Sequence, residues 1–165
     1  MEKKLTIAAN VAIIFVAVIV AITYAKSWKQ SQSSNVESVN SRALIGKQFP
    51  IAQSWGTYRK TVVLALSVGC PYCSASAPFY QRLTAYAASH QVNVVALLPQ
   101  SKEEGSQYLQ QLKLNIPVVG DVDFQQINVS GTPTLFLVDG KGLVQEVWRG
   151  QLHENGEDKV LSTLS

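Results

Sequence analysis

The stretch KTVVLALSVGCPYCSASAPFYQRLTAYAASH, residues 60–90, decides the fold. Its first part, residues 60–68, is a short run of β-branched and aliphatic side chains, which is typical of a strand buried on both faces. In residues 74–90 apolar side chains recur every three or four positions, which predicts a helix. The sequence therefore predicts a strand-to-helix junction, and the only two cysteines of the chain, Cys70 and Cys73, lie in that junction.

The placement of Cys70 and Cys73 indicates redox chemistry. The partial positive charge and the free N–H groups at a helix N-terminus stabilise a thiolate. Cys-X-X-Cys thiols in such a position have pKa values of about 3.5–7.5, against about 8.5 for free cysteine. Cys70 would then be a nucleophile at neutral pH, and Cys73 is one helical turn away, where it can close a disulfide with Cys70. Pro71 suits the first helical turn, because that position needs no N–H.

Three other roles for the cysteine pair stay open. A structural disulfide is disfavoured, because closing a short loop gives little entropic stabilisation. A zinc site needs four ligands, and the chain adds only His90 and His153, which lack the spacing of a ligand pair. An inert buried pair would be a coincidence at such a junction. We therefore expect neither a metal nor another cofactor.

Outward from the junction, strands and helices alternate. The order that we expect is a buried strand at 92–98, a helix at 101–113, an extended piece at 117–119, a strand at 134–138, a tight turn at 139–142, an edge strand at 143–148 and a short helix after residue 156. Strands separated by helices pair in parallel through right-handed crossovers, and the hairpin adds an antiparallel edge. We therefore predict a three-layer α/β/α domain with a mixed central sheet, from residue 44 to residue 165.

A second feature, Gly131-Thr132-Pro133-Thr134, directly precedes the strand that we expect at 134–138. Proline is tolerated at the start of a strand, and a cis peptide bond there makes a tight turn. Most X-Pro bonds are trans, but the position before a buried strand favours the cis form. We expect a cis bond between Thr132 and Pro133.

The N-terminal part begins with an uncharged, mainly apolar run at residues 5–25, long enough to cross a bilayer as a helix. We interpret residues 1–25 as a membrane anchor and residues 26–43 as a polar linker. A short tail before such an anchor is the usual layout of a signal anchor, and it places the domain outside the cytoplasm. A cleaved signal peptide stays open, although its apolar part usually has about 7–15 residues. A buried core helix is disfavoured, because the run is not amphipathic.

The formal charge of the chain, +3, belongs to the part that precedes the domain. Residues 46–165 hold nine basic and nine acidic side chains, so the expected domain is neutral. Domains that bind nucleic acid carry clustered Lys and Arg side chains on the folded surface. We therefore expect no nucleic-acid partner.

These features together resemble the thioredoxin superfamily. The resemblance covers residues 44–165 and rests on a strand, Cys-Pro-Tyr-Cys, a helix with Pro78 five residues after the second cysteine, and Thr132-Pro133 before a strand. The segment order and the phrase TPTLFLVDGKGLVQEVWRG, residues 132–150, most resemble membrane-anchored TlpA-like disulfide oxidoreductases.

The resemblance implies a thioredoxin-like fold, preceded by one N-terminal transmembrane helix, and thiol–disulfide exchange with protein substrates outside the cytoplasmic membrane. It also implies a reductase that a membrane partner reduces again. The attacking thiolate would be Cys70, and Cys73 would be the resolving thiol. The site residues that it implies are, for catalysis, Cys70 and Cys73; for substrate binding, Thr132, Pro133 and Tyr72; and for support of the active-site helix, Pro71 and Pro78, of which Pro78 would kink it.

The sequence departs from thioredoxins at two positions. Gly69 stands where thioredoxins have Trp, and Leu64 stands where they have a buried acid, so no carboxylate is evident that could deprotonate Cys73. Cys-Pro-Tyr-Cys is also the dithiol of glutaredoxins, but the long spacing from Cys73 to Pro133 and the anchor fit that family poorly. Two alternatives remain open, a glutaredoxin-like activity and a membrane-tethered binding module whose disulfide is structural.

Overall fold

The computed structural model describes residues 18–20, 43–51 and 55–165. Contacts divide the chain into two compact units, and the second, Ser41–Ser165, contains the fold described below. Among the described residues, no helix is long and apolar enough to cross a membrane.

The membrane anchor expected at 1–25 and the linker expected at 26–43 lie outside the described residues, except for residues 18–20, which are helical. The expected division of the chain into an anchor, a linker and a domain that begins at residue 44 therefore stays a prediction.

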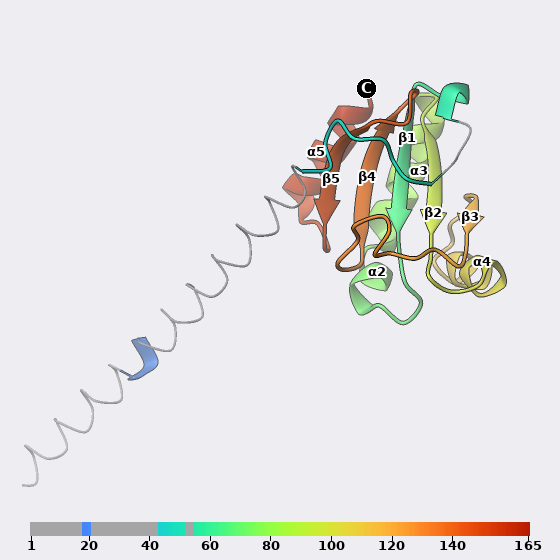
Figure 1. Ribbon diagram of the computed structural model, residues 1–165. Coiled ribbons are helices and arrows are strands. Elements are labelled where there is room, and N and C mark those ends of the chain that lie inside the picture. The colour runs from blue at the N-terminus through green and yellow to red at the C-terminus, as the bar shows by residue number, and fades with distance from the viewer. Residues whose placement is uncertain (1–17, 21–42, 52–54) are drawn as a thin grey trace, which may run out of the picture. The chain divides into compact units, whose positions relative to one another are not determined.

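A five-stranded mixed sheet forms the centre of the second unit (Figure 1). Its strands are β1 (Lys60–Ala65), β2 (Asn93–Leu97), β3 (Val118–Val119), β4 (Thr134–Asp139) and β5 (Val144–Arg149). They lie in the order β3-β2-β1-β4-β5. Strand β2 is parallel to β1 and β3, whereas β4 is antiparallel to β1 and β5. The predicted mixed sheet with an antiparallel hairpin at its edge is confirmed.

The α-helices contribute to the core on one face of this sheet. They are α2 (Pro71–Ala75), α3 (Ala77–Ser89), α4 (Lys102–Gln111) and α5 (Glu154–Leu164). Their buried side chains, such as Leu83, Leu109 and Val160, join Leu64 and Leu135 of the sheet in one core cluster. In Figure 1, α3 runs behind β1 and β2.

The opposite face is covered differently from the prediction. Its core cluster contains Phe49, Val122 and Ile127 from irregular segments, and the one helical element that packs against it in the described chain is the 3₁₀-helix η1 (Trp55–Thr57). The segments in front of the sheet in Figure 1 are loops. The third layer of the predicted α/β/α arrangement therefore consists of turns instead of α-helices. Positive φ angles at Asp121 and Asn128 interrupt any helix there.

The helix after the dithiol differs from the single helix predicted at 74–90. It begins earlier, at Pro71, and it is interrupted at Ser76, where α2 ends and α3 begins. Proline inside a helix removes a hydrogen bond and clashes with the carbonyl group four residues before it. The interruption places Pro78 in the first turn of α3, where proline is tolerated. The kink expected from Pro78 thus takes the form of two consecutive helices.

Candidate active site

The dithiol lies where β1 leads into α2. Cys70 is the N-cap residue of α2, and its Sγ atom accepts a hydrogen bond from the backbone N–H of Cys73 at 3.4 Å. The backbone N–H of Cys70 donates to the carbonyl oxygen of Ser67 at 3.2 Å. Gly69 has a φ of +79°, a value that glycine adopts at no steric cost. This turn presents both cysteines, which are free thiols, at the carboxyl end of β1.

The peptide bond between Thr132 and Pro133 is cis, as predicted, and it lies beside the dithiol. The Cys70 thiol donates to the carbonyl oxygen of Thr132 at 3.3 Å. Two further hydrogen bonds hold this turn. The Thr134 hydroxyl donates to the carbonyl oxygen of Gly131 at 2.7 Å. The backbone N–H of Gly150 donates to the carbonyl oxygen of Pro133, also at 2.7 Å. The turn before β4 is therefore fixed against the nucleophile.

The two thiols have opposite electrostatic environments. Burial raises the pKa of Cys70. Hydrogen bonds outweigh this effect and hold the pKa below its ordinary value; they come from the Cys73 thiol, from Thr132 and from the backbone of Cys73 and Tyr72. Burial and the interaction with Cys70 raise the pKa of Cys73 to about 12, although the Ser67 backbone and Thr132 lower it. Cys70 is half-buried and Cys73 is fully buried. This arrangement can supply one accessible thiolate and one protected thiol.

The other predicted site residues lie around this pair. Tyr72 is 60% exposed, and Pro71 occupies the first turn of α2. Pro78 is exposed in the first turn of α3. The structure thus brings Cys70, Cys73 and the Thr132–Pro133 peptide bond together, and it leaves Tyr72 at the rim.

Gln100 is a residue near the site that sequence reasoning missed. Its side-chain oxygen accepts from the N–H of Val68 at 3.2 Å, and its side-chain nitrogen donates to the Ser67 hydroxyl at 3.2 Å. Its own carbonyl oxygen accepts from the N–H of Asp121 at 2.8 Å. Gln100 therefore ties the residues before Cys70 to the loop after β2. The sequence feature that could have pointed to Gln100 is its position soon after a buried strand, at the same edge of the sheet as the dithiol.

The groups with the largest influence on the pKa of either thiol include no carboxylate. Leu64, which stands at the position of the thioredoxin acid, is fully buried in the core. Among the described residues, no group of three or more His, Cys, Asp or Glu side chains is placed to hold a metal ion.

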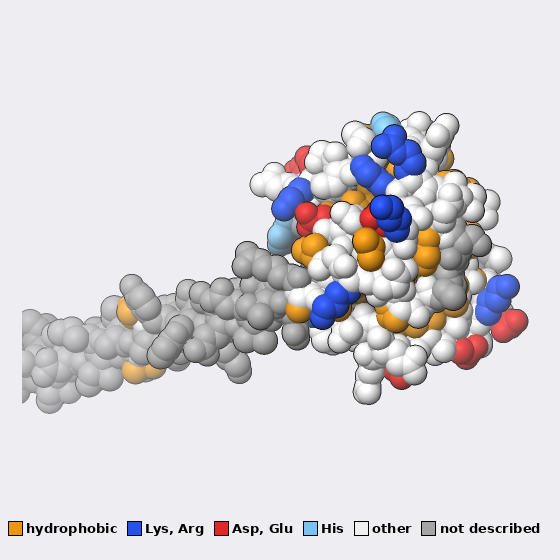
Figure 2. Space-filling view, turned by 45° about the horizontal axis from the view of Figure 1, so that its top comes forward, with side chains coloured by type: hydrophobic (Ala, Val, Ile, Leu, Met, Phe, Trp, Pro, Cys, Tyr) orange, Lys and Arg blue, Asp and Glu red, His pale blue; other side chains and the backbone are white. Residues whose placement is uncertain are grey.

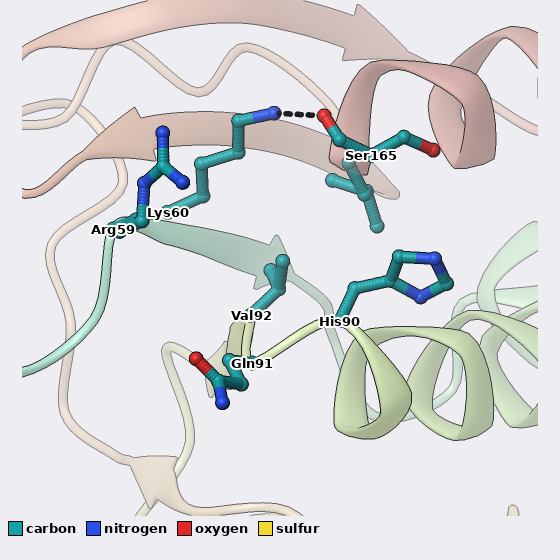
Figure 3. Close-up of a pocket in the computed structure, with 7 residues that line it drawn as sticks. Arg59, Lys60, His90, Gln91, Val92 and Ser165 are labelled. Atoms are coloured by element: carbon teal, nitrogen blue, oxygen red, sulfur yellow. Dashed lines mark hydrogen bonds between the residues drawn. The ribbon is translucent and has the colours of Figure 1, made fainter.

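A separate pocket of about 110 Å³ lies near the start of β1, at the opposite end of that strand from the dithiol (Figure 3). Arg59, Lys60, His90 and Ser165 are among its lining residues. Lys60 Nζ already donates to the carbonyl oxygens of Thr163 and Ser165, at 2.7 and 2.9 Å. The pocket contains no thiol, and its lysine is occupied in holding the end of α5, so it does not compete as the reaction site.

Charged side chains are spread over the face of the domain that Figure 2 shows. Lys and Arg side chains lie scattered there among uncharged and hydrophobic ones, and they do not form one broad basic patch. This distribution agrees with the equal numbers of basic and acidic residues in 46–165.

Comparison with known proteins adds a family match. The family model described as Redoxin matches residues 34–164. The comparison with curated proteins gives no match.

Solved structures share the fold at low sequence identity. One is a Chlorobium tepidum protein provisionally assigned as the thiol:disulfide interchange protein DsbE, with 22% identity, 73% of this chain and 98% of that chain covered, and a TM-score of 0.62. A thiol-disulfide isomerase from Corynebacterium glutamicum is 19% identical, with 73% and 91% covered and a TM-score of 0.57. A secreted Mycobacterium tuberculosis disulfide oxidoreductase is 20% identical, with 64% and 80% covered and a TM-score of 0.51.

Proposed function

Since this chain belongs to the Redoxin family and is a thiol–disulfide oxidoreductase with a thioredoxin-like fold, we propose that it reduces disulfide bonds in protein substrates outside the cytoplasm. The observation that carries the proposal is the difference between its two thiols. Cys70 is partly exposed and has a lowered pKa, whereas Cys73 is fully buried and has a pKa raised to about 12. A thiolate is the attacking species in disulfide exchange, so the reaction begins at Cys70.

The reaction takes two exchange steps. In the first, the Cys70 thiolate attacks one sulfur of the substrate disulfide; a mixed disulfide forms, and the other substrate sulfur leaves as a thiolate that takes up a proton. In the second, Cys73 loses its proton and attacks Cys70 Sγ. The bond between Cys70 and the substrate breaks, and its electron pair leaves with the substrate sulfur. The substrate is then a dithiol, and Cys70 and Cys73 share a disulfide.

The surroundings of Cys70 suit an extended protein segment as substrate. Two exposed apolar side chains, Val68 at 41% and Tyr72 at 60%, lie within two residues of Cys70 in the sequence. Thr132 is half-buried beside the thiol, so its backbone is within reach of a substrate strand, while Pro133 is buried beneath it. Val68 joins the expected substrate contacts Tyr72, Thr132 and Pro133 in this proposal.

The location belongs to the proposal as well. An anchor at residues 1–25 and a linker at 26–43 would hold the domain at the outer side of the cytoplasmic membrane. The similar Mycobacterium tuberculosis protein is a secreted one. Each turnover leaves the dithiol oxidised, so a membrane partner with its own dithiol must reduce it again. Labelling intact cells with a membrane-impermeant maleimide tests the location: reduced Cys70 is labelled if the domain lies outside and is protected if it lies inside.

Reduction of insulin disulfides tests the activity. The full chain, with dithiothreitol as electron source, should accelerate insulin precipitation, and Cys70→Ser should abolish the effect. Cys73→Ser should accumulate mixed disulfides with proteins through Cys70, because the resolving thiol is missing. If neither single-cysteine variant traps a protein and insulin is not reduced, the tethered binding module replaces the enzyme. Activity restricted to glutathione mixed disulfides would indicate the glutaredoxin-like alternative.

A further inference from the structure

Arg149 is the last residue of β5, the edge strand beside β4, and its side chain is half-buried without an acidic partner (Figure 1). The one ion pair among the described residues joins Arg82 and Glu157. The Nε atom of Arg149 is buried and has no hydrogen-bond partner in the described part of the chain. A buried donor without a partner lowers stability, and proteins mostly leave arginine exposed. An arginine at this position therefore calls for a use of its two terminal nitrogen atoms.

Both terminal nitrogen atoms of Arg149 donate to the same loop. Nη1 donates to the Ser130 hydroxyl at 3.0 Å, and Nη2 donates to the carbonyl oxygen of Asn128 at 3.3 Å. The guanidinium group is planar and presents its donors as a rigid fork, so it can hold two acceptors in fixed positions, whereas a lysine offers one point charge on a flexible stem. Arg149 therefore fastens the loop 128–130 to the edge strand β5 at two points.

The backbone next to Arg149 holds the segment that follows this loop. The N–H of Gly150 donates to the carbonyl oxygen of Pro133 at 2.7 Å. The side chain of Arg149 thus holds the chain before Thr132, and the backbone of Gly150 holds it after Thr132. Between these two points lies the cis peptide bond, and the carbonyl oxygen of Thr132 accepts from the Cys70 thiol there at 3.3 Å.

Few other contacts in the described chain hold residues 130 and 131. Val129 is packed in the core of this face, but Ser130 and Gly131 after it are exposed. A Cβ atom on Gly131 would have no described atom within 4 Å. The hydroxyl of Thr134 holds the Gly131 carbonyl oxygen at 2.7 Å, and the bonds from Arg149 hold the other end of this segment. Without those bonds the segment could move, and the cis turn with it.

We propose that Arg149 is a positioning residue for the exchange reaction: its guanidinium group holds the cis turn against Cys70, so that the backbone at Thr132 is ready to pair with a protein substrate. The inference rests on the proposed function, since it concerns how a protein substrate reaches Cys70. A loosened turn must be ordered again each time a protein binds to it, which weakens binding. A small disulfide that reacts with Cys70 without pairing with the turn does not bear that cost. Arg149 therefore favours protein disulfides over small ones.

Two disulfide substrates of different size test this role. The reduced full chain, in mild detergent, is mixed with excess insulin or with excess dithiobis-nitrobenzoate. Quenching, alkylation and mass spectrometry follow the loss of thiols with insulin, and thionitrobenzoate absorbance follows the small reagent. The rates are compared on the alkaline plateaus of their pH profiles, where Cys70 is ionised in every variant, so a changed pKa of Cys70 does not enter the comparison. Arg149→Met should slow the insulin reaction by about tenfold, the effect of one hydrogen bond to a charged group, and leave the small reagent within about twofold.

Three further variants complete the experiment. Arg149→Lys keeps the positive charge but not the fork, so it should restore only part of the insulin rate. Ser130→Ala removes one acceptor at an exposed position and should slow the insulin reaction by about threefold, with no added effect in the double variant with Arg149→Met. Arg82→Met makes the same substitution at the arginine that pairs with Glu157 and joins α3 to α5, and it should leave both reactions within about twofold.

The outcomes separate the inference from the proposed function. An unmodified chain that reacts with dithiobis-nitrobenzoate but does not reduce insulin would defeat the proposed function itself. If the unmodified chain reduces insulin, and Arg149→Met reduces it as fast as Arg82→Met, the role of Arg149 is overturned. Equal slowing of both substrates in Arg149→Met also overturns it, because the dithiol itself would then be disturbed. If Arg149→Met does not fold, Ser130→Ala decides in its place, and an unchanged insulin rate in that variant overturns the role.

Discussion

Cys70 Sγ lies 3.3 Å from the carbonyl oxygen of Thr132, a residue 62 positions further along the chain. This contact joins the end of β1 to the turn before β4, and it places the nucleophile against a cis peptide bond. A substrate segment that reaches Cys70 therefore also meets the backbone at Thr132. The same residue lowers the pKa of both thiols, so one side chain influences the attacking and the resolving cysteine.

The Thr132 hydroxyl gives the first prediction. Thr132→Val removes the hydroxyl and keeps the shape of the side chain, so the pKa of Cys70 should rise. The pH profile of Cys70 alkylation by iodoacetamide should therefore shift toward higher pH, so that the reaction is slower wherever the thiol is only partly ionised. Thr132→Ser keeps the hydroxyl and should react almost normally, and equal rates for the Val and Ser variants would contradict the assignment.

The difference between the two thiols predicts a pH dependence. In the reduced protein, Cys70 should be alkylated at neutral pH, while Cys73 should stay unmodified until the solution approaches its raised pKa of about 12. Peptide mapping by mass spectrometry after alkylation at several pH values distinguishes the two sites. Simultaneous modification of both cysteines in the folded protein at neutral pH would contradict the account.

The raised pKa of Cys73 also makes the stability of the fold depend on pH. The direction of this dependence is opposite to that caused by the lowered pKa of Cys70. A thiol with a raised pKa stabilises the fold below its ordinary value of 9.0, and this contribution is lost as the pH rises toward about 12. The lowered pKa of Cys70 stabilises the fold above its ordinary value and is lost as the pH falls through the lowered value. Urea unfolding of the reduced protein should therefore show a loss of stability above about pH 9 that Cys73→Ala diminishes.

The two side-chain bonds of Gln100 predict a local effect on the dithiol turn. Gln100→Met keeps the length of the side chain and loses the bonds to Val68 and Ser67, so the turn before Cys70 should loosen. The expected loss is about 1–2 kcal/mol of unfolding free energy, with a changed pKa of Cys73, which depends on the Ser67 backbone. Gln100→Glu still accepts from both groups and should retain most of the stability.

Gln110 on the exposed side of α4 supplies the control for that experiment. Gln110→Met makes the same change in a side chain that forms no hydrogen bond with the described part of the chain, so its stability should stay within about 0.5 kcal/mol of the unmodified protein. The assignment is wrong if Gln100→Met and Gln110→Met unfold at the same urea concentration.

Gly120 gives a prediction on packing near the same loop. A Cβ atom at this position would lie 2.3 Å from the backbone nitrogen of Lys102 and 2.8 Å from the carbonyl oxygen of Gln100. These are backbone atoms at the start of α4, which cannot turn away, so Gly120→Ala should cost about 1–3 kcal/mol or more. Gly56→Ala, where no atom of the described residues lies within 4 Å of the new Cβ atom, should change thermal stability little. Comparable melting temperatures for the two variants would refute this reading.

The sequence predicted the parts of the molecule that depend on local pattern. The buried run before Cys70 and the apolar periodicity after Cys73 predicted the junction, and Pro133 before a buried strand predicted the cis bond. Both signals act within a few residues of the feature that they predict. The order of strands and helices fixed the mixed sheet for the same reason, since crossover rules restrict how neighbouring elements pair.

Features that depend on contacts between distant segments were not predictable in this way. The layer opposite the helices is built from turns, and turns at residues such as Asp121 carry no apolar period that would announce them. In the sequence, Gln100 reads as an ordinary loop residue. Only the folded arrangement brings its side chain to Ser67, 33 residues earlier.

The reduction potential of the Cys70–Cys73 pair tests the central claim most directly. The full chain is equilibrated with dithiothreitol buffers of defined ratio, quenched, alkylated and analysed by mass spectrometry. We expect one reversible two-electron couple between these two sulfurs, near the value of about −270 mV of thioredoxin and far from the value of about −120 mV of the oxidant DsbA. A potential near the oxidising value would contradict the reductase direction, and two cysteines that stay thiols in every buffer would contradict the exchange reaction itself.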